Sequence, residues 1–228
     1  MIYILCGDIR IGKTCLMTYL ATQKAQDAAK NAKMREKVAN LLQRRFNVVK
    51  EPYALYADYK INYDNMHGRI IKSKIIDPLR IGKSLFIRPY STIAINEGQS
   101  YFHSHEWQQF SPKQAKFFQT SGHYGLDIYF DTQNLNLIEG SIRGIAKIIE
   151  VKNLTIFDSR HKKTDFADKY NFSQMTWDIV FYNRAADYER QKDGKRQKIT
   201  AKYNVFDTYN PYEHYDDFLP ENKDDIII

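Results

Sequence analysis

Cysteine is almost absent from this 228-residue chain, which contains only Cys6 and Cys15. Two cysteines exclude a disulfide framework and a zinc site built from cysteines. Both flank the same glycine-containing segment near the N-terminus. We expect them to be small, buried, apolar side chains in a reducing compartment.

Long apolar runs are also missing. No window approaches the roughly 20 apolar residues that a membrane-spanning helix needs, and Ile226–Ile228 is far too short. The N-terminal apolar run spans only Ile2–Cys6 and lacks a basic leader, which excludes a signal peptide. We therefore expect a soluble, intracellular chain.

The overall composition is ordinary for a globular protein, with 43% hydrophobic and 27% charged residues. The length suffices for one α/β domain plus an appendage. A formal net charge of +7 weakly favours a polyanionic partner, either nucleic acid or a membrane surface.

The N-terminus carries a complete phosphate-binding loop. Ile2–Cys6 predicts a buried strand, and residues 7–14, GDIRIGKT, match the G-x-x-x-x-G-K-[ST] motif ahead of a helical pattern. The glycines let backbone N–H groups surround phosphate oxygens, Lys13 reaches the β- and γ-phosphates, and the Thr14 hydroxyl holds Mg²⁺. We expect nucleotide contacts from Gly7, Asp8, Ile9, Arg10, Ile11, Gly12, Lys13, Thr14 and Cys15.

Two later strands end in residues that suit ATP hydrolysis. Residues 91–95 run into Asn96 and Glu97, where phosphate-loop ATPases place a metal-orienting residue and then a residue that polarises the attacking water. We assign the metal position to Asn96, which is neutral, and the catalytic base to Glu97. Residues 125–133 end at Gln133, whose amide suits a sensor of the γ-phosphate; a strand-capping amide is the alternative.

Strands and helices alternate along most of the chain. Residues 16–46 predict one long helix or two, residues 53–62 and 146–152 predict strands, and residues 112–121 predict a helix. Short segments around residues 67–71 suggest a hairpin. This alternation predicts an α/β fold with a mostly parallel five-stranded sheet and helices on both faces.

The pattern changes after residue 152. Residues 154–157, 177–183 and 199–208 predict antiparallel strands, with a hairpin turn at Asp193-Gly194. The basic arms of this hairpin suit either a grip on a nucleic-acid backbone or the protection of a sheet edge. We divide the chain into an ATPase core over residues 1–152, an antiparallel extension over 153–212 and an acidic, poorly ordered tail over 213–228.

Three other features carry weaker signals. Residues 80–84, RIGKS, resemble a phosphate loop, but Asp77 stands where the first glycine belongs, so we interpret them as a turn. His103, His105 and Glu106 lack a further ligand at a metal-binding spacing, and we expect no metal there. We interpret the basic face of the helix over residues 16–46 as solvated; contact with nucleic acid or anionic lipid is the alternative.

The order of these motifs resembles the zonula occludens toxin-like family, the cytoplasmic ATPases of filamentous-phage assembly. The segments that carry the resemblance are the phosphate loop and residues 95–102 (INEGQSYF), 122–133 (GHYGLDIYFDTQ), 138–143 (IEGSIR) and 205–209 (VFDTY). In that family a His-x-Gly-x-Asp segment leads into a strand that ends in Thr-Gln. The resemblance implies a RecA-like ATPase core, related to DNA translocases, that uses ATP and Mg²⁺.

The resemblance also implies partners and a location. Such proteins are thought to couple ATP hydrolysis to the export of single-stranded phage DNA, as rings, hexamers especially, beside inner-membrane assembly proteins. This chain departs from the family at Asn96, where Asp is usual, and at Gly122, where an Arg often stands. Arg143 is then the candidate for an arginine finger from a neighbouring subunit. The family's membrane-spanning segment is missing, so we expect a cytoplasmic chain held at the inner membrane by a longer sequence or a partner.

Two other functions stay open. One is a nucleotide-binding assembly protein with little or no hydrolysis, which the neutral Asn96 would mark. The other is a small-molecule kinase, which shares the phosphate loop but would need an arginine-rich lid that we do not find in the sequence.

Overall fold

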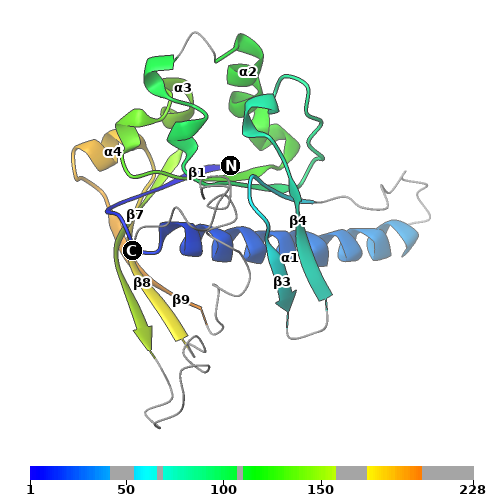
Figure 1. Ribbon diagram of the computed structural model, residues 1–228. Coiled ribbons are helices and arrows are strands. Elements are labelled where there is room, and N and C mark those ends of the chain that lie inside the picture. Colours follow the sequence, from blue (N-terminus) through cyan, green and yellow to red (C-terminus); the bar gives the residue numbers. More distant parts are fainter. Residues whose placement is uncertain (42–53, 66–68, 107–109, 158–173, 202–228) are drawn as a thin grey trace, which may run out of the picture.

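One nine-stranded sheet organises the computed structural model, which describes residues 1–41, 54–65, 69–106, 110–157 and 174–201 (Figure 1). Its strand order is β3-β4-β2-β5-β6-β1-β7-β8-β9. The six strands from β4 to β7 are parallel, β3 pairs antiparallel at one edge, and β8 and β9 pair antiparallel at the other. The strands are β1 (Ile2–Cys6), β2 (Leu55–Ala57), β3 (Asn62–Asn65), β4 (Arg69–Ile75), β5 (Thr92–Ile95), β6 (Asp127–Asp131), β7 (Lys147–Phe157), β8 (Gln174–Tyr182) and β9 (Lys195–Ala201).

Helices cover both faces of the sheet, as predicted. Figure 1 shows α1 (Lys13–Leu41) along one face, with α2 (Pro112–Thr120) and α3 (Gly140–Arg143) on the other; α4 (Ala185–Glu189) lies beyond β8 in sequence. Successive side chains of a strand point to opposite faces. Accordingly, Ile4 packs in a core cluster with Phe118 of α2, whereas Leu5 packs in a second cluster with Leu16 of α1.

The strand order places three loops at one edge of the sheet. β6 lies between β1 and β5, and Phe130 is in register with Ile4 of β1 and Ile95 of β5. Because these strands are parallel, their carboxyl ends meet at the same edge, where open α/β sheets bind their ligands. The phosphate loop, the Asn96-Glu97 turn and the segment after Asp131 therefore converge.

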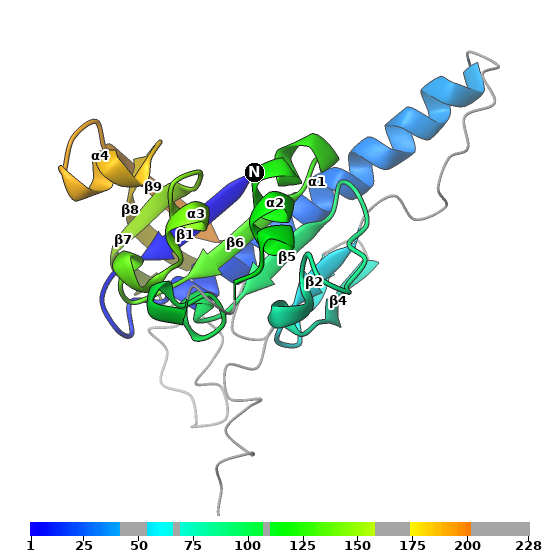
Figure 2. The ribbon, with the colours of Figure 1, turned by 90° about the horizontal axis from the view of Figure 1, so that it is seen from above.

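The helix after the phosphate loop is single and begins three residues earlier than predicted. It spans 29 residues from Lys13, and its second half extends past the sheet (Figure 2). Residues 42–46, also predicted as helical, lie outside the described residues. Within the part of the chain that the structure covers, no helix has the length and apolarity to cross a bilayer.

Three sequence predictions about strands are corrected. The parallel part of the sheet has six strands rather than five, because β4, the second arm of the hairpin suggested near residues 67–71, also pairs with β2. Residues 146–152 and 154–157 form one strand, β7, because pairing with β8 continues from Ile148 to Phe157 across a bulge at Val151/Asn153. The proposed division at residue 152 falls within this strand and stays a prediction.

The third correction concerns the turn at Asp193-Gly194. β8 and β9 pair antiparallel as predicted, but α4 lies in their connection and β9 begins at Lys195, directly after Gly194. Ala185 of α4 is buried in the core cluster that also contains Val180, which favours a packed helix over a two-residue hairpin. Residues 202–208 of the predicted last strand, the motif over 205–209 and the tail over 213–228 lie outside the described residues.

The antiparallel strands contact the phosphate loop directly. The indole Nε1 of Trp177 on β8 donates to the carbonyl oxygen of Gly12 at 3.2 Å. Trp177 is fully buried, and its ring stacks on Tyr19 of α1 with centroids 6.0 Å apart. The C-terminal strands therefore help to shape the loop at the other end of the sequence.

Candidate active site

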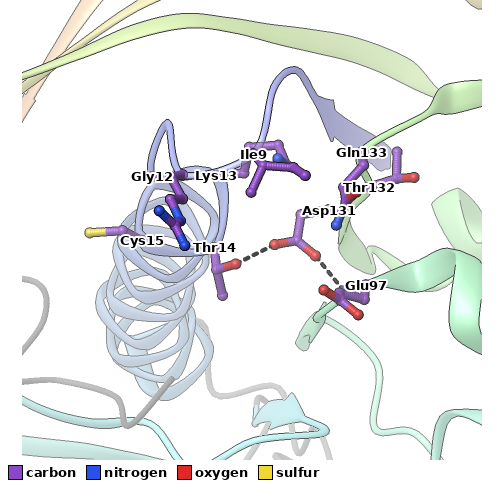
Figure 3. Close-up of a pocket in the computed structure, with 10 residues that line it drawn as sticks. Ile9, Gly12, Lys13, Thr14, Cys15, Glu97, Asp131, Thr132 and Gln133 are labelled. Atoms are coloured by element: carbon purple, nitrogen blue, oxygen red, sulfur yellow. Dashed lines mark hydrogen bonds between the residues drawn. The ribbon is translucent and has the colours of Figure 1, made fainter. Parts of the chain in front are cut away.

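A pocket of about 200 Å³ opens at the carboxyl ends of β1, β5 and β6 (Figure 3). It brings together the three residues predicted to be catalytic, Lys13, Glu97 and Gln133, which come from three separate segments. Their roles stay predictions, but their convergence is what those roles require. The full lining is Ile9, Arg10, Gly12, Lys13, Thr14, Cys15, Glu97, Asp131, Thr132 and Gln133.

The phosphate loop has the conformation that its glycines predict. Gly7 and Gly12 have φ angles of +142° and +75°, and Leu16 N–H donates to the Gly12 carbonyl to start α1. The Lys13 ammonium donates to the carbonyl oxygens of Gly7 at 3.1 Å and Asp8 at 2.7 Å. Burial lowers the pKa of Lys13. The N-terminus of α1 adds partial positive charge, so the loop suits an anion such as a phosphate group.

Replacing Gly7 with alanine should destabilise the fold as well as the loop. A Cβ at Gly7 would lie 2.5 Å from the Val151 carbonyl oxygen, a backbone atom that cannot move aside alone. Together with the left-handed φ, this clash should lower the free energy of unfolding by about 2 kcal/mol or more in denaturant titrations. Gly122→Ala is the matched control, because nothing lies within 4 Å of its added Cβ. Equal stability of the two variants would contradict the geometry.

Asp131, at the end of β6, is the central carboxylate of the site and was missed by the sequence analysis. Its Oδ2 accepts from the Thr14 hydroxyl at 2.5 Å and its Oδ1 accepts from the Glu97 backbone N–H at 2.5 Å (Figure 3). The residue is 2% exposed, and burial raises its pKa to about 6, although the bonds from Thr14 and Glu97 work against that shift. The sequence shows a carboxylate at the end of the predicted strand that leads to Gln133, but not that this strand lies beside β1.

Glu97 adopts a backbone conformation that few non-glycine residues tolerate. Its φ and ψ are 46° and 55°, in the left-handed region, and its backbone N–H is held by Asp131. Its side chain is exposed at the pocket. Strained non-glycine residues concentrate at functional sites, which is consistent with the role predicted for Glu97.

A second buried carboxylate, Asp58, holds the backbone of the turn at Asn96 and Glu97. Both of its oxygens accept from the Asn96 backbone N–H, at 3.0 and 3.2 Å. Asp58 follows β2 and is 6% exposed, and burial raises its pKa to about 7. No role for Asp58 could be predicted from the sequence, because nothing local marks this aspartate as buried.

Asp58 should make stability depend on pH. Because the pKa of Asp58 is higher in the folded state, its protonated form stabilises the fold. This contribution to the free energy of unfolding is complete below the ordinary pKa of 3.8 and is lost as pH rises through about 7. The Tm of Asp58→Asn should therefore gain on that of wild type as pH rises from about 4 to about 7. Asp27→Asn, at an exposed carboxylate of α1, is the control. A difference in Tm between Asp58→Asn and wild type that does not change with pH would contradict this prediction.

Several predicted residues lie beside the pocket rather than in its lining. Gly7, Asp8 and Ile11 belong to the loop, and Asn96 lies next to Thr14 with its side chain 3.1 Å from the hydroxyl oxygen. Arg143 donates from Nη1 to the Asn136 side chain at 2.8 Å and does not line the pocket. Its proposed action on a neighbouring subunit stays a prediction.

The oxygen donors around Thr14 fit Mg²⁺. The Thr14 hydroxyl and the Asp131 carboxylate are hard ligands at the mouth of the phosphate loop. Mg²⁺ is bound in many nucleotide sites by one or two such groups, with phosphates and waters completing the shell. Among the described residues no group of three or more His, Cys, Asp or Glu side chains could form a metal cage, and His103 and His105 do not belong to one.

A match to a protein-family model places the chain in a family. The family model for zonular occludens toxin (Zot) matches residues 1–178, most of the chain. The chain belongs to the Zot family. The predicted resemblance is thereby confirmed. No curated protein matches this Zot-family chain in sequence.

Solved structures agree with the Zot assignment at the level of the fold. The crystal structure of the N-terminal domain of zonular occludens toxin from Neisseria meningitidis has a TM-score of 0.54 and 12% identity, covering 92% of this chain and 98% of that one. The genome packaging NTPase B204 from Sulfolobus turreted icosahedral virus 2 also matches. With sulfate its TM-score is 0.41 at 12% identity (86% and 95% covered), and with AMPPCP 0.43 at 13% (86% and 96%). Only the Zot domain, of these, scores above 0.5 and thereby shares the fold of this chain.

Proposed function

We propose that this Zot-family chain is an ATP-hydrolysing motor of filamentous-phage assembly, which couples hydrolysis to the export of single-stranded phage DNA. One observation carries the proposal. Lys13, Glu97 and Gln133, from the segments that follow three neighbouring parallel strands, line one pocket at the phosphate loop. This arrangement supplies a phosphate-binding cation, a base and an amide within one site.

Each of these residues has a distinct part in the proposed reaction. Lys13 would exchange its bonds to the Gly7 and Asp8 carbonyls for bonds to the β- and γ-phosphates. Glu97 would accept a proton from the attacking water, and the Gln133 amide would orient that water and report loss of the γ-phosphate. Thr14 would hold Mg²⁺, which when bound neutralises charge on the phosphates.

The C-terminal strands offer a surface for a polyanion. Exposed basic side chains follow one another through the α4–β9 segment. A groove of about 600 Å³ is lined by Lys152, Arg196 and Lys198, and also by Asp178, which forms an ion pair with Lys198 at 3.6 Å. Two exposed acidic residues, Glu189 and Asp193, share the segment. We propose this surface as the contact with DNA. Its exposed basic residues are Arg184, Arg190, Lys192, Lys195, Arg196 and Lys198.

The remaining parts of the proposal concern assembly. We propose a ring of subunits, a hexamer being the first expectation, with nucleotide between neighbours and Arg143 as a finger into the adjacent site. The ring would lie at the cytoplasmic face of the inner membrane beside membrane-embedded assembly proteins.

The rate of ATP hydrolysis with and without single-stranded DNA tests the function. We expect hydrolysis that single-stranded DNA stimulates more than duplex DNA does. Nucleotide binding without turnover would instead identify an assembly protein that uses ATP as a structural ligand. Transfer of phosphate to a small molecule, without a response to DNA, would overturn the proposal in favour of a kinase.

A further inference from the structure

Two side chains lie beside the Thr14 hydroxyl, the proposed metal ligand. Asn96 has an amide where the family usually has a carboxylate, and Asp131 is a carboxylate that was not predicted. Asn96 follows β5, and Asp131 ends β6. β6 is the immediate neighbour of β1, whereas β5 is one strand further away. The strand order therefore brings Asp131, rather than the residue after β5, closest to the phosphate loop.

The contacts of Thr14 show which side chain supplies negative charge. Its hydroxyl lies 2.5 Å from Asp131 Oδ2 and 3.1 Å from the side-chain amide of Asn96. An amide carries no net charge, so Asp131 is the anionic group in contact with the hydroxyl that would hold Mg²⁺. Hard cations favour carboxylate oxygen over neutral ligands when charge on phosphates must be balanced.

The orientation of Asn96 suits a supporting role. Its amide satisfies its neighbours when Nδ2 donates to both oxygens of Asp131, at 3.1 and 3.2 Å, and to Thr14 Oγ1 at 3.1 Å. An aspartate at position 96 would instead face Asp131 with a second negative charge at this distance, which is unfavourable without a cation. The amide and the carboxylate are thus complementary as they stand.

We propose that Asp131 supplies the carboxylate ligand of the Mg²⁺ that accompanies the nucleotide, and that Asn96 holds this carboxylate in place instead of binding the metal. The inference rests on the proposed function, because it concerns the metal of that site. It also connects metal and base: Asp131 Oδ1 holds the backbone N–H of Glu97, so the same side chain fixes both.

The test is the affinity for a fluorescent ATP analogue, measured in Mg²⁺ and in EDTA. Wild type should bind more tightly in Mg²⁺. Asp131→Asn should bind the analogue as tightly as wild type does in EDTA. In Mg²⁺ its affinity should increase at least about 10-fold less than that of wild type. In the double variant Asn96→Asp/Asp131→Asn the carboxylate stands on the neighbouring strand, and we expect part of the gain to return. The electron paramagnetic resonance signal of Mn²⁺ with ADP should follow the same pattern.

Failure of this inference differs from failure of the proposed function. If Asp131→Asn keeps the full Mg²⁺-dependent gain and the Mn²⁺ signal, Asp131 is not the ligand and the inference is overturned, whatever the hydrolysis rate. If wild type binds no nucleotide in either solution, the proposed function fails first. Unchanged affinity of Asp131→Asn in EDTA shows that the variant is folded.

Discussion

Lys13→Ala should abolish the ATPase activity that we propose for this chain and weaken its binding of nucleotide. Lys13 is half-buried at the pocket, and its ammonium group already donates hydrogen bonds to two carbonyl oxygens of its own loop. A hydrogen bond to a charged group contributes about 1.5–3 kcal/mol, so its loss should lower affinity roughly 10- to 100-fold. Hydrolysis should fall further, because the Lys13 ammonium would no longer balance the charge that develops on the transferred phosphoryl group. Isothermal titration and phosphate release measure the two effects.

Lys83→Ala is the matched control for this prediction. Lys83 stands in RIGKS, residues 80–84, which resembles the end of a phosphate loop in sequence. In the structure residues 82–84 form a turn between Ile81 and Leu85, with neither a strand before it nor a helix after it. Removal of that lysine should leave binding and hydrolysis unchanged. Equal losses in both variants would refute a specific role for Lys13.

Glu97→Gln should stop hydrolysis while leaving the nucleotide bound. A side chain that accepts a proton in the transition state contributes about 10²–10⁴-fold to the rate, and glutamine keeps the shape without the base. The backbone bond from Glu97 N–H to Asp131 does not involve the side chain, so the turn should survive the substitution. Affinity for ATP should stay within a few-fold of wild type, and single-turnover experiments should show unhydrolysed ATP in the site.

Glu189→Gln provides the comparison, because Glu189 is an exposed glutamate of α4 outside the pocket. Its hydrolysis rate should equal that of wild type. A Glu97→Gln variant that turns over ATP at the wild-type rate would exclude Glu97 as the base. Gln133 would then be the remaining predicted catalytic residue at a strand end in the pocket.

The phosphate loop could be predicted because its chemistry is written in adjacent residues. Gly7 to Thr14 form one continuous motif, and the apolar strand before it and the helix after it are local patterns too. The strand ends at Glu97 and Gln133 could be predicted as well, because polar residues follow two apolar runs there. The structure brings both to the pocket.

Asp131 and Asp58 could not be assigned in the same way. The role of Asp131 depends on β6 being the neighbour of β1, and strand order is set by packing between residues more than a hundred positions apart. Asp58 matters because it is buried beneath Asn96, and nothing in the residues around it marks an aspartate after a strand as buried. In both cases the deciding information is tertiary.

The wrong predictions about the fold have a similar origin. Asp193-Gly194 is a strong local signal for a hairpin, but Ala185 finds a place in the core and α4 forms instead. The sixth parallel strand, β4, could not be counted because a hairpin arm reveals its second neighbour, β2, only in three dimensions. Local patterns therefore predicted most helices and strands, but they predicted fewer of the pairings between strands.

The position of β1 in the sheet has a consequence for synthesis. Its neighbours are β6 and β7, residues 127–157, and Gly12 meets Trp177. During translation the phosphate loop is therefore made before the strands that contact it, and Trp177 follows Gly12 by 165 residues. Until those strands are made, the apolar segment Ile2–Cys6 emerges from the ribosome without its partner strands, a state that favours aggregation and chaperone binding.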